Sequence, residues 1–466
     1  MARLSTVEAA QAAGGRVTAG DPGAWTQGAA IDSRAVRGGE LFFAFAGEHT
    51  DGHRFVPDAL ARGAAAAVVQ EDLPAMPAGA LIRVDDTFKA LHDIARFART
   101  RVPERLVGIT GSAGKTTTKE LLGAILGSKF RTAWTPGNLN NLYGFPLSLL
   151  NVPDGTEWMV AEMGMSTPGE LRQLSLLGRP DAVVFTVVRP VHLEFFDSLQ
   201  AIAEAKSEIL AGLAPGGFVV ANADDPEVAR IAKRHGARVV WYGLTSEGVD
   251  VRARNLSPEP AGEIGSRFTL EAGGESVEVR LPLHGLYNVE NCLAAAACAW
   301  ALGLPLAEIA EAVRGVKPAA MRGIVHRAES GFTLVDDSYN SNPDALGKAL
   351  EGAAVLPAER RVAILGDMRE LGPTGPTFHR ESGERAARLG FSPVVAVGEL
   401  SRELAAGAEA AGAAAVWLPD AAAAAEWAAG EVRPGDLVIV KASRGVGLDK
   451  VVRRLLGDTG AGEGGH

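Results

Sequence analysis

Cysteine is scarce in this chain, which has two among 466 residues and no long hydrophobic run. Cys292 and Cys298 fall in one helical pattern, about 9 Å apart along the axis and on different faces. They therefore cannot form a disulfide, and we expect both to be buried. No stretch of eighteen apolar residues is present, and the N-terminal segment lacks the apolar centre of a signal peptide. We predict a cytoplasmic location without membrane insertion.

An excess of basic residues is also missing. Lysine and arginine total 46 against 56 acidic residues, the formal charge is −10, and no long basic run occurs. This balance argues against nucleic acid as the main partner, although local clusters of positive charge remain suited to a phosphorylated small molecule. The hydrophobic fraction of 47% and charged fraction of 22% are ordinary for a globular protein. The length predicts about three domains.

Strand-like and helix-like segments alternate along most of the chain, which predicts an α/β protein with parallel sheets flanked by helices. Residues 1–102 mix short apolar runs with helical stretches, and Pro103 indicates a boundary. A second alternation covers 103–316, with a strand-rich part from 238 to 283 that predicts added antiparallel strands. A third alternation covers 317–457, and the tail 458–466 is predicted to be disordered. Ligands of such sheets bind at the carboxyl ends of the strands.

A glycine-rich turn joins an apolar run to a helical pattern in "VGITGSAGKTTTKELLGAIL", residues 107–126. This arrangement predicts a phosphate-binding loop, because backbone N–H groups and a helix N-terminus then face an anion. The loop comprises Gly111, Ser112, Ala113, Gly114, Lys115 and Thr116, and Thr117 follows it. Its glycine spacing is shorter than that of the general motif. The alternative is a tight strand-to-helix turn without a ligand, but the flanking pattern favours a nucleotide triphosphate.

Three residues have the chemistry that a nucleotide site needs. Lys115 is suited to neutralise the β and γ phosphates, and the Thr116 hydroxyl is a hard oxygen ligand for Mg²⁺. Glu162 ends an apolar strand in "WMVAEMG", where a carboxylate reaches a phosphate-bound cation. The alternative for Glu162 is a solvated strand end.

His192 and Lys206 are ambiguous when read alone. His192 follows another apolar strand, and a lone histidine is more often structural than a ligand. Lys206 lies in the next helical segment between Glu204 and Glu208, a pattern typical of surface ion pairs.

Ten motifs in fixed order change these interpretations: "GSAGKTTTKE", "TPGNLNNLYGFPL", "AEMGMSTPGEL", "HLEFF", "AEAKSEI", "NADDP", "HGLYNVENCLAA", "MRG", "DDSYNSNP" and "LGDMRELG". Together they resemble the Mur ligases of peptidoglycan synthesis, over roughly residues 28–450. The resemblance implies an N-terminal UDP-sugar-binding domain, a central ATPase domain and a C-terminal Rossmann-like domain. It is strongest to the members that join D-alanyl-D-alanine to UDP-N-acetylmuramoyl-tripeptide through an acyl phosphate.

The resemblance also implies roles for residues that match the motifs. For ATP they are the loop from Gly111 to Thr116 with Thr117, Asn288 and Asn291 beside adenine, and Arg322 and Asp337 as further nucleotide contacts. For two Mg²⁺ ions they are Thr116, Glu162, His192 as second-metal ligand, and Lys206 as a carbamylated lysine. For the UDP substrate they are Asp32, Ser33, Arg34, Asn138 and Asn141, and for the dipeptide Tyr339, Asn340 and Asn342. Without the resemblance, the asparagines at 138, 140 and 141 are typical loop formers, and residues 339–342 are typical of a helix cap before Pro343.

One departure from the family pattern concerns Asp197, which stands where a glycine is usual and puts the turn after His192 in doubt. The layout implies domain closure, because Asp337 must reach a nucleotide held by the loop in another domain. Other amide ligases of the family, folylpolyglutamate synthases among them, and a P-loop kinase or nucleotide-regulated binding protein remain alternatives. We expect a monomer, and the residues leave open both the oligomeric state and whether the third residue of the tripeptide is lysine or diaminopimelate.

Overall fold

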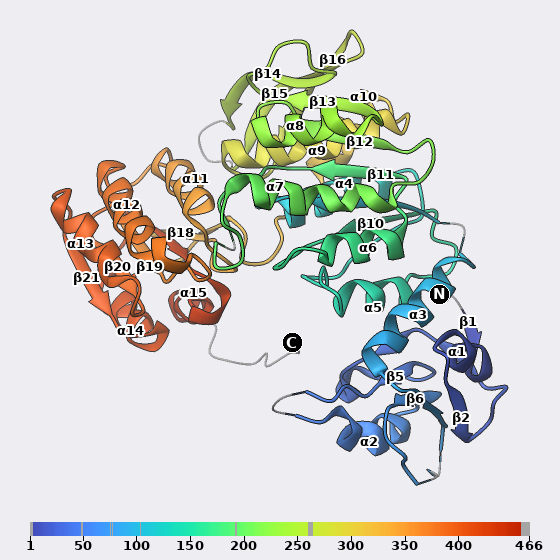
Figure 1. The fold of residues 1–466 in the computed structure, drawn as a ribbon. Coiled ribbons are helices and arrows are strands. Elements are labelled where there is room, and N and C mark those ends of the chain that lie inside the picture. Colours follow the sequence, from blue (N-terminus) through green and yellow to red (C-terminus); the bar gives the residue numbers. More distant parts are fainter. Residues whose placement is uncertain are drawn as a thin grey trace.

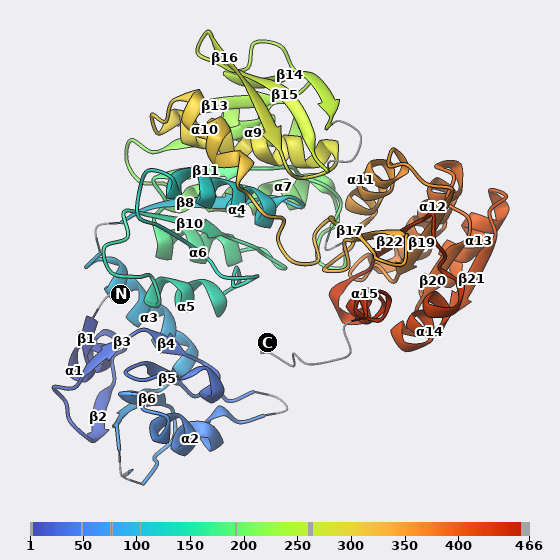
Figure 2. The ribbon, with the colours of Figure 1, turned by 180° about the vertical axis from the view of Figure 1, so that it is seen from behind.

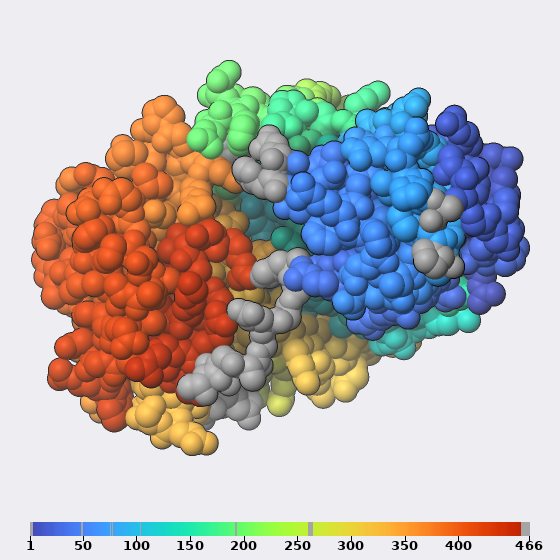
Figure 3. All heavy atoms as spheres, turned by 90° about the horizontal axis from the view of Figure 1, so that it is seen from below, coloured from blue at the N-terminus to red at the C-terminus, as the bar shows by residue number. Residues whose placement is uncertain are grey.

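The chain forms three sheet-based units in a computed structural model that describes residues 3–47, 50–74, 76, 78–102, 104–191, 193–259 and 264–457. In the view of Figure 1 the first unit lies below the second, and the third unit lies to the left of the second. Seen from below, the first and third units flank a hollow with atoms of the second unit visible at its bottom (Figure 3). The fold class predicted from the alternating pattern, three α/β units, is confirmed.

The first unit is built on a five-stranded sheet in the order β2-β7-β6-β5-β4, in which only β2 is antiparallel. Its strands are β2 (Arg16–Ala19), β4 (Ala29–Ala30), β5 (Leu41–Phe43), β6 (Ala66–Val69) and β7 (Ala80–Arg83), and a separate pair joins β1 (Arg3–Ser5) to β3 (Trp25–Gln27). Its helices are α1 (Thr6–Ala12), α2 (Val56–Ala61) and α3 (Thr87–Arg99), with 3₁₀ turns η1 (Ser33–Ala35) and η2 (Gly52–Phe55). Helix α3 begins after the side-chain cap Asp86 and buries the stripe from Ala90 to Ala98 in a core that this sheet shares with helices of the second unit.

The second unit contains a nine-stranded sheet in the order β16-β15-β14-β13-β12-β11-β8-β10-β9. The strands are β8 (Arg105–Thr110), β9 (Thr132–Trp134), β10 (Trp158–Glu162), β11 (Ala182–Phe185), β12 (Phe218–Asn222), β13 (Arg238–Gly243), β14 (Val251–Pro258), β15 (Ser266–Ala272) and β16 (Glu275–Leu281). Added antiparallel strands are present as predicted, but they comprise only the ribbon β14-β15-β16. The prediction that they begin at 238 is wrong, because β13 returns after helix α8 (Pro226–His235) and pairs parallel with β12.

Two layers of helices cover this sheet (Figures 1 and 2). One layer is α4 (Lys115–Gly127), α9 (Leu286–Ala301) and α10 (Leu306–Arg314), and the other is α5 (Gly144–Leu150), α6 (Glu170–Gly178), α7 (Leu199–Ser207) with η3 (Glu208–Gly212), and α8. Both cysteines lie in α9, where each is buried and free, as predicted. Burial raises the pKa of both thiols.

The third unit has a six-stranded sheet in the order β17-β18-β22-β19-β20-β21, parallel except for β17. Its strands are β17 (Ile324–Arg327), β18 (Thr333–Asp336), β19 (Arg360–Gly366), β20 (Val394–Val397), β21 (Ala415–Leu418) and β22 (Asp436–Lys441). Helices α11 (Pro343–Ala354), α12 (Gly375–Arg388) and α13 (Arg402–Ala410) cover one face, and α14 (Ala421–Glu431) and α15 (Asp449–Leu456) the other. Nowhere in the described part of the chain does a helix combine the length and hydropathy that crossing a bilayer requires.

Candidate active site

The predicted phosphate loop lies where β8 ends and α4 begins. Gly111 has φ 151° and Gly114, the residue before α4, has φ 83°, so both need the conformational freedom of glycine. A Cβ atom at Gly111 would stand 1.9 Å from the Thr186 hydroxyl, which donates to the Ala113 carbonyl at 2.6 Å. Lys115 opens the helix, and its Nζ donates to the Gly111 carbonyl at 2.9 Å. The loop is therefore held by hydrogen bonds to its own carbonyl groups, and the N-terminus of α4 faces the cavity together with Lys115.

Glu162 forms the wall beside this loop. It ends β10, which pairs parallel with β8, and only 2% of its surface is exposed. Its carboxylate accepts from the Thr116 hydroxyl at 2.7 Å through one oxygen and from Asn140 Nδ2 at 2.7 Å through the other. The alternative of a solvated strand end is thus wrong. The sequence indicated only a loop former at Asn140, because its contact with Glu162 depends on a strand twenty-two residues away.

Lys206 lies on α7 with its ammonium buried behind the loop, where Nζ donates to the Gly111 carbonyl at 3.2 Å. Burial, and secondarily the charge of Lys115, lowers its pKa well below the ordinary value. The prediction of a surface ion pair between Lys206 and its acidic neighbours is wrong, because the carboxylate of Glu204 contacts Arg230 and Arg234 instead. A lower pKa increases the share of neutral amine, which is the form that carbamylation requires.

The turn before α7 bears on the departure at Asp197. Asp197 is exposed and does not belong to the residues with positive φ, so the turn does not need glycine here. Ser198, the next residue, caps α7 by accepting from the Ala201 N–H at 3.1 Å. His192, predicted as a metal ligand, lies outside the described residues.

Two predicted asparagines stand on the first turns of α9. Asn291 lies under the loop, since a Cβ atom at Gly114 would stand 2.1 Å from its Oδ1. Asn288 lies one turn earlier, is buried, and donates to the His284 carbonyl at 2.7 Å. Its contact with Asn291 is long, at 3.4 Å.

The third unit supplies the opposite wall. Asp337 follows β18 and forms an ion pair with Lys441, the last residue of β22, with Nζ 2.5 Å from the carboxylate. Lys441 also donates to the Asn340 carbonyl at 2.8 Å. The Tyr339 ring lies under the Arg322 guanidinium, 4.1 Å from its centroid. Asn342 caps α11 by accepting from the Ala345 N–H, so the helix-cap interpretation holds for this residue.

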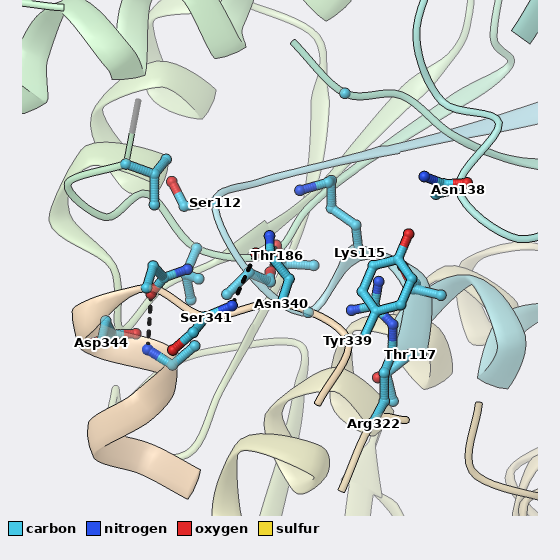
Figure 4. A pocket seen from close by; sticks show the side chains of 18 of the residues that line it. Ser112, Lys115, Thr117, Asn138, Thr186, Arg322, Tyr339, Asn340, Ser341 and Asp344 are labelled. Atoms are coloured by element: carbon cyan, nitrogen blue, oxygen red, sulfur yellow. Dashed lines mark hydrogen bonds between the residues drawn. The ribbon is translucent and has the colours of Figure 1, made fainter. Parts of the chain in front are cut away.

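Side chains from both walls gather around one cavity of about 580 Å³ (Figure 4). The predicted residues that line it are Ser112, Ala113, Gly114, Lys115, Thr116, Thr117, Asn138, Asn141, Glu162, Lys206, Asn291, Arg322, Asp337, Tyr339, Asn340 and Asn342. Gly111 contributes its carbonyl from behind, and Asn288 stands one helical turn away. Segments that are far apart in the sequence thus meet at the carboxyl ends of two sheets, as the alternating pattern predicts.

Three predicted residues lie elsewhere. Asp32, Ser33 and Arg34 are in the first unit, where Asp32 caps η1 and binds Arg34 with Nη2 2.7 Å from the carboxylate. That ion pair lowers the pKa of Asp32. These residues are not among those that line the cavity, so the structure does not bring them together with the phosphate loop.

The cavity is also lined by charged residues to which the sequence analysis gave no role: Glu170, Glu290, Asp344, Lys348, Arg369, Glu370, Lys441 and Arg444. A signal existed for two of them. The segment "DLVIVKASRG" is an apolar strand that ends in basic residues, and the carboxyl ends of parallel strands are where ligands bind. The ion pair between Lys348 and Glu290, at 2.9 Å, was not predictable from the sequence, because it joins helices of different units.

The chain is similar to known proteins along most of its length. Three family models match: the Mur ligase family catalytic domain over residues 26–99, the Mur ligase middle domain over 109–299, and the Mur ligase glutamate ligase domain over 321–444. UDP-N-acetylmuramoyl-tripeptide–D-alanyl-D-alanine ligase of Bacillus subtilis is 34% identical over 92% of this chain and 93% of its own length. The enzyme of that name from Escherichia coli is 36% identical over 80% and 81%.

Solved structures agree in fold over nearly the whole chain. The crystal structure of MurF from Acinetobacter baumannii superposes with a TM-score of 0.87 at 28% identity, covering 98% of this chain and 99% of that one. MurF ligase from Thermotoga maritima in complex with ADP gives a TM-score of 0.79 at 28% identity, covering 93% and 98%.

Proposed function

Because this chain belongs to the Mur ligase family, we propose that it joins D-alanyl-D-alanine to UDP-N-acetylmuramoyl-tripeptide with hydrolysis of ATP. The observation that carries the proposal is the shared cavity in which the phosphate loop faces Asp337, Tyr339 and the basic residues of the third unit. A ligase of this kind must hold ATP and two further anionic or zwitterionic substrates together. The Bacillus subtilis relative, which covers 92% of this chain, carries the name of this reaction.

In the proposed reaction the tripeptide carboxylate attacks the γ-phosphate of ATP, so that an acyl phosphate forms and ADP leaves. The amine of the dipeptide then attacks the acyl carbon, and phosphate leaves as the amide bond forms. Catalysis of the first step is mainly positioning and charge stabilisation, since two anions must approach each other. Lys115 supplies positive charge at the loop, and backbone N–H groups at the start of α4 add to it.

The residues beside the loop fit a divalent cation. Thr116 and Glu162 offer hard oxygen atoms at hydrogen-bond distance from each other, which is the donor type that Mg²⁺ prefers. Bound Mg²⁺ supplies charge neutralisation between carboxylate and phosphate. Lys206 in carbamylated form adds a further anionic group behind the loop, and its buried, low-pKa amine supports that assignment. His192 stays a predicted ligand of the second ion.

The remaining assignments belong to the same proposal. Asn288 and Asn291 face adenine, Arg322 and Asp337 contact the nucleotide, and Tyr339, Asn340 and Asn342 contact the dipeptide. Asp32, Ser33 and Arg34 hold the UDP moiety in the first unit, while Asn138 and Asn141 contact the peptide part. We retain domain boundaries near Pro103 and Lys317, a monomeric enzyme and a cytoplasmic location where ATP is available.

The proposal is tested by phosphate release from ATP with one or both acceptor substrates. Release should require UDP-muramyl-tripeptide and D-alanyl-D-alanine together, and the Lys115→Ala variant should lose about 3–4 kcal/mol of transition-state stabilisation, as when one preorganised donor is removed. Phosphate release without the dipeptide, or a phosphorylated product that accumulates, would instead support a kinase or a nucleotide-regulated binding protein.

A further inference from the structure

Lys119 is a fully buried lysine that lies outside the cavity. It stands one turn after Thr116 on α4, on the same side of the helix, and its side chain has no exposed surface. Its Nζ donates to the Thr135 carbonyl at 2.7 Å and to the Gly137 carbonyl at 3.0 Å. It also contacts the Glu120 carboxylate at 3.1 Å. The ammonium therefore directs its hydrogen bonds to one backbone segment and one neighbour.

That segment, residues 135–141, is here named the asparagine loop. It connects β9 to helix α5 and contains Asn138, Asn140 and Asn141. Three backbone hydrogen bonds join it to the rest of the unit: the Thr135 N–H donates to the Val160 carbonyl, the Asn140 carbonyl accepts from the Gly164 N–H, and the Asn141 carbonyl accepts from the Phe145 N–H. Since loops with few partners change conformation easily, the two bonds from Lys119 are a large part of what holds this loop on α4.

The asparagine loop is joined to the Glu162 wall in two places. The Thr135 hydroxyl accepts from the Glu162 N–H at 3.1 Å, and Asn140 Nδ2 donates to the Glu162 carboxylate at 2.7 Å. Glu162 in turn accepts from the Thr116 hydroxyl. The hydrogen bonds thus form a closed circuit from Thr116 along α4 to Lys119, through the loop to Asn140 and Glu162, and back to Thr116.

A buried ammonium is a poor choice if stability alone is required. Removing a charge from water costs several kcal/mol, and apolar replacements of similar volume are often neutral or stabilising. A methionine at this position would avoid that cost. What it would lack is directed donors for two carbonyls of the loop.

From this circuit we infer that Lys119 is a positioning residue for the proposed ligase reaction. It fixes the asparagine loop on α4 and so sets the place of Asn140 and Glu162 relative to Thr116. Because Asn138 and Asn141 are in the same loop, Lys119 also sets the wall that faces the UDP-linked substrate. The inference rests on the proposed function only for its kinetic readout.

Hydrogen exchange of the ligand-free full-length protein tests the structural part. Lys119→Met should increase exchange in peptides that cover 135–141 and leave peptides of α9 unchanged. Lys129→Met is the matched control, because Lys129 follows the same helix, is 42% exposed and contacts only Glu308 among the ion pairs of the described residues. Equal exchange in the two variants would overturn the inference whether or not the chain is a ligase.

Steady-state kinetics test the positioning role. Lys119→Met should lower kcat and raise KM for UDP-muramyl-tripeptide. Together these changes should lower kcat/KM by roughly 10- to 100-fold, which is the effect expected when a catalytic group is misplaced by about 1 Å. KM for D-alanyl-D-alanine should stay within about twofold, because that substrate faces the third unit. A smaller amount of folded enzyme would instead lower kcat with every KM unchanged, and that result contradicts a positioning role.

Asn140→Ala and the double variant add a test that partial unfolding does not imitate. Since both residues act in one circuit, the double variant should lose little more activity than Lys119→Met alone. Fully additive losses would show that the two act independently. Lys119→Gln keeps a neutral NH₂ group with two donors and should show the same pattern with a smaller loss. If both Lys119 variants fail to fold, Lys119 is a structural residue and the inference is wrong.

Discussion

The two ends of helix α4 offer a matched pair of glycine substitutions. Gly114 precedes the helix at φ 83°, and Gly127 ends it without a positive φ and with no heavy atom within 4 Å of the place where a Cβ atom would stand. Gly114→Ala places a Cβ atom 2.1 Å from Asn291 Oδ1. Gly127→Ala meets nothing. The same chemical change therefore tests the phosphate loop at one end and helix propensity at the other.

The expected free energies have opposite signs. A non-glycine residue in the left-handed region costs about 1–2 kcal/mol, and the clash adds to this because Asn291 must rotate away. We expect Gly114→Ala to destabilise the second unit by about 2–3 kcal/mol, which lowers its melting temperature by roughly 4–10 °C. Gly127→Ala should stabilise by about 0.4–1 kcal/mol, because alanine restricts the unfolded chain at a position with an ordinary backbone.

Calorimetry and nucleotide titration measure both effects. Because the loop is displaced, the Gly114→Ala variant should also bind ATP at least about tenfold more weakly, which corresponds to ~1.4 kcal/mol. Gly127→Ala should bind ATP as the wild type does. A Gly114→Ala protein with unchanged melting temperature and ATP affinity would refute the view that this loop needs a left-handed glycine packed against Asn291.

Two further predictions concern charge. In CO₂-free buffer the wild type should gain stability relative to Lys206→Met as pH rises toward 10.5. The reason is that the pKa of Lys206 is lower in the folded than in the unfolded state, so the unfolded state binds more protons in this pH range. Urea midpoints across this pH range that run parallel would contradict it, and native mass with added bicarbonate checks for the carbamate. Asp344→Asn removes the negative charge from the 3.3 Å ion pair with Arg189 that joins the third unit to the second. We expect kcat/KM for the dipeptide to fall by about two- to fivefold at low salt, and an equal loss at high salt would exclude an electrostatic cause.

Much of the site was predictable because it depends on local backbone geometry. The phosphate loop requires glycine at two positions with positive φ, and "GSAGKTTT" states that requirement in consecutive residues. Glu162 was predictable for a similar reason, since an apolar strand with an acid at its end has one place in a parallel sheet. Asn342 had two interpretations, and the helix cap that the structure shows is compatible with its place in the cavity wall.

The sequence by itself determined the α/β alternation, the three units and the phosphate loop, because strand periodicity, turn residues and glycine conformations act between near neighbours in the chain. Only the tertiary structure decided that Lys206 is buried away from Glu204, that β13 is parallel, and that Asn140 and Lys119 complete a circuit around Glu162. Burial and hydrogen bonding between distant segments depend on how sheets and helices pack, and that packing sets the solvation of each charged side chain.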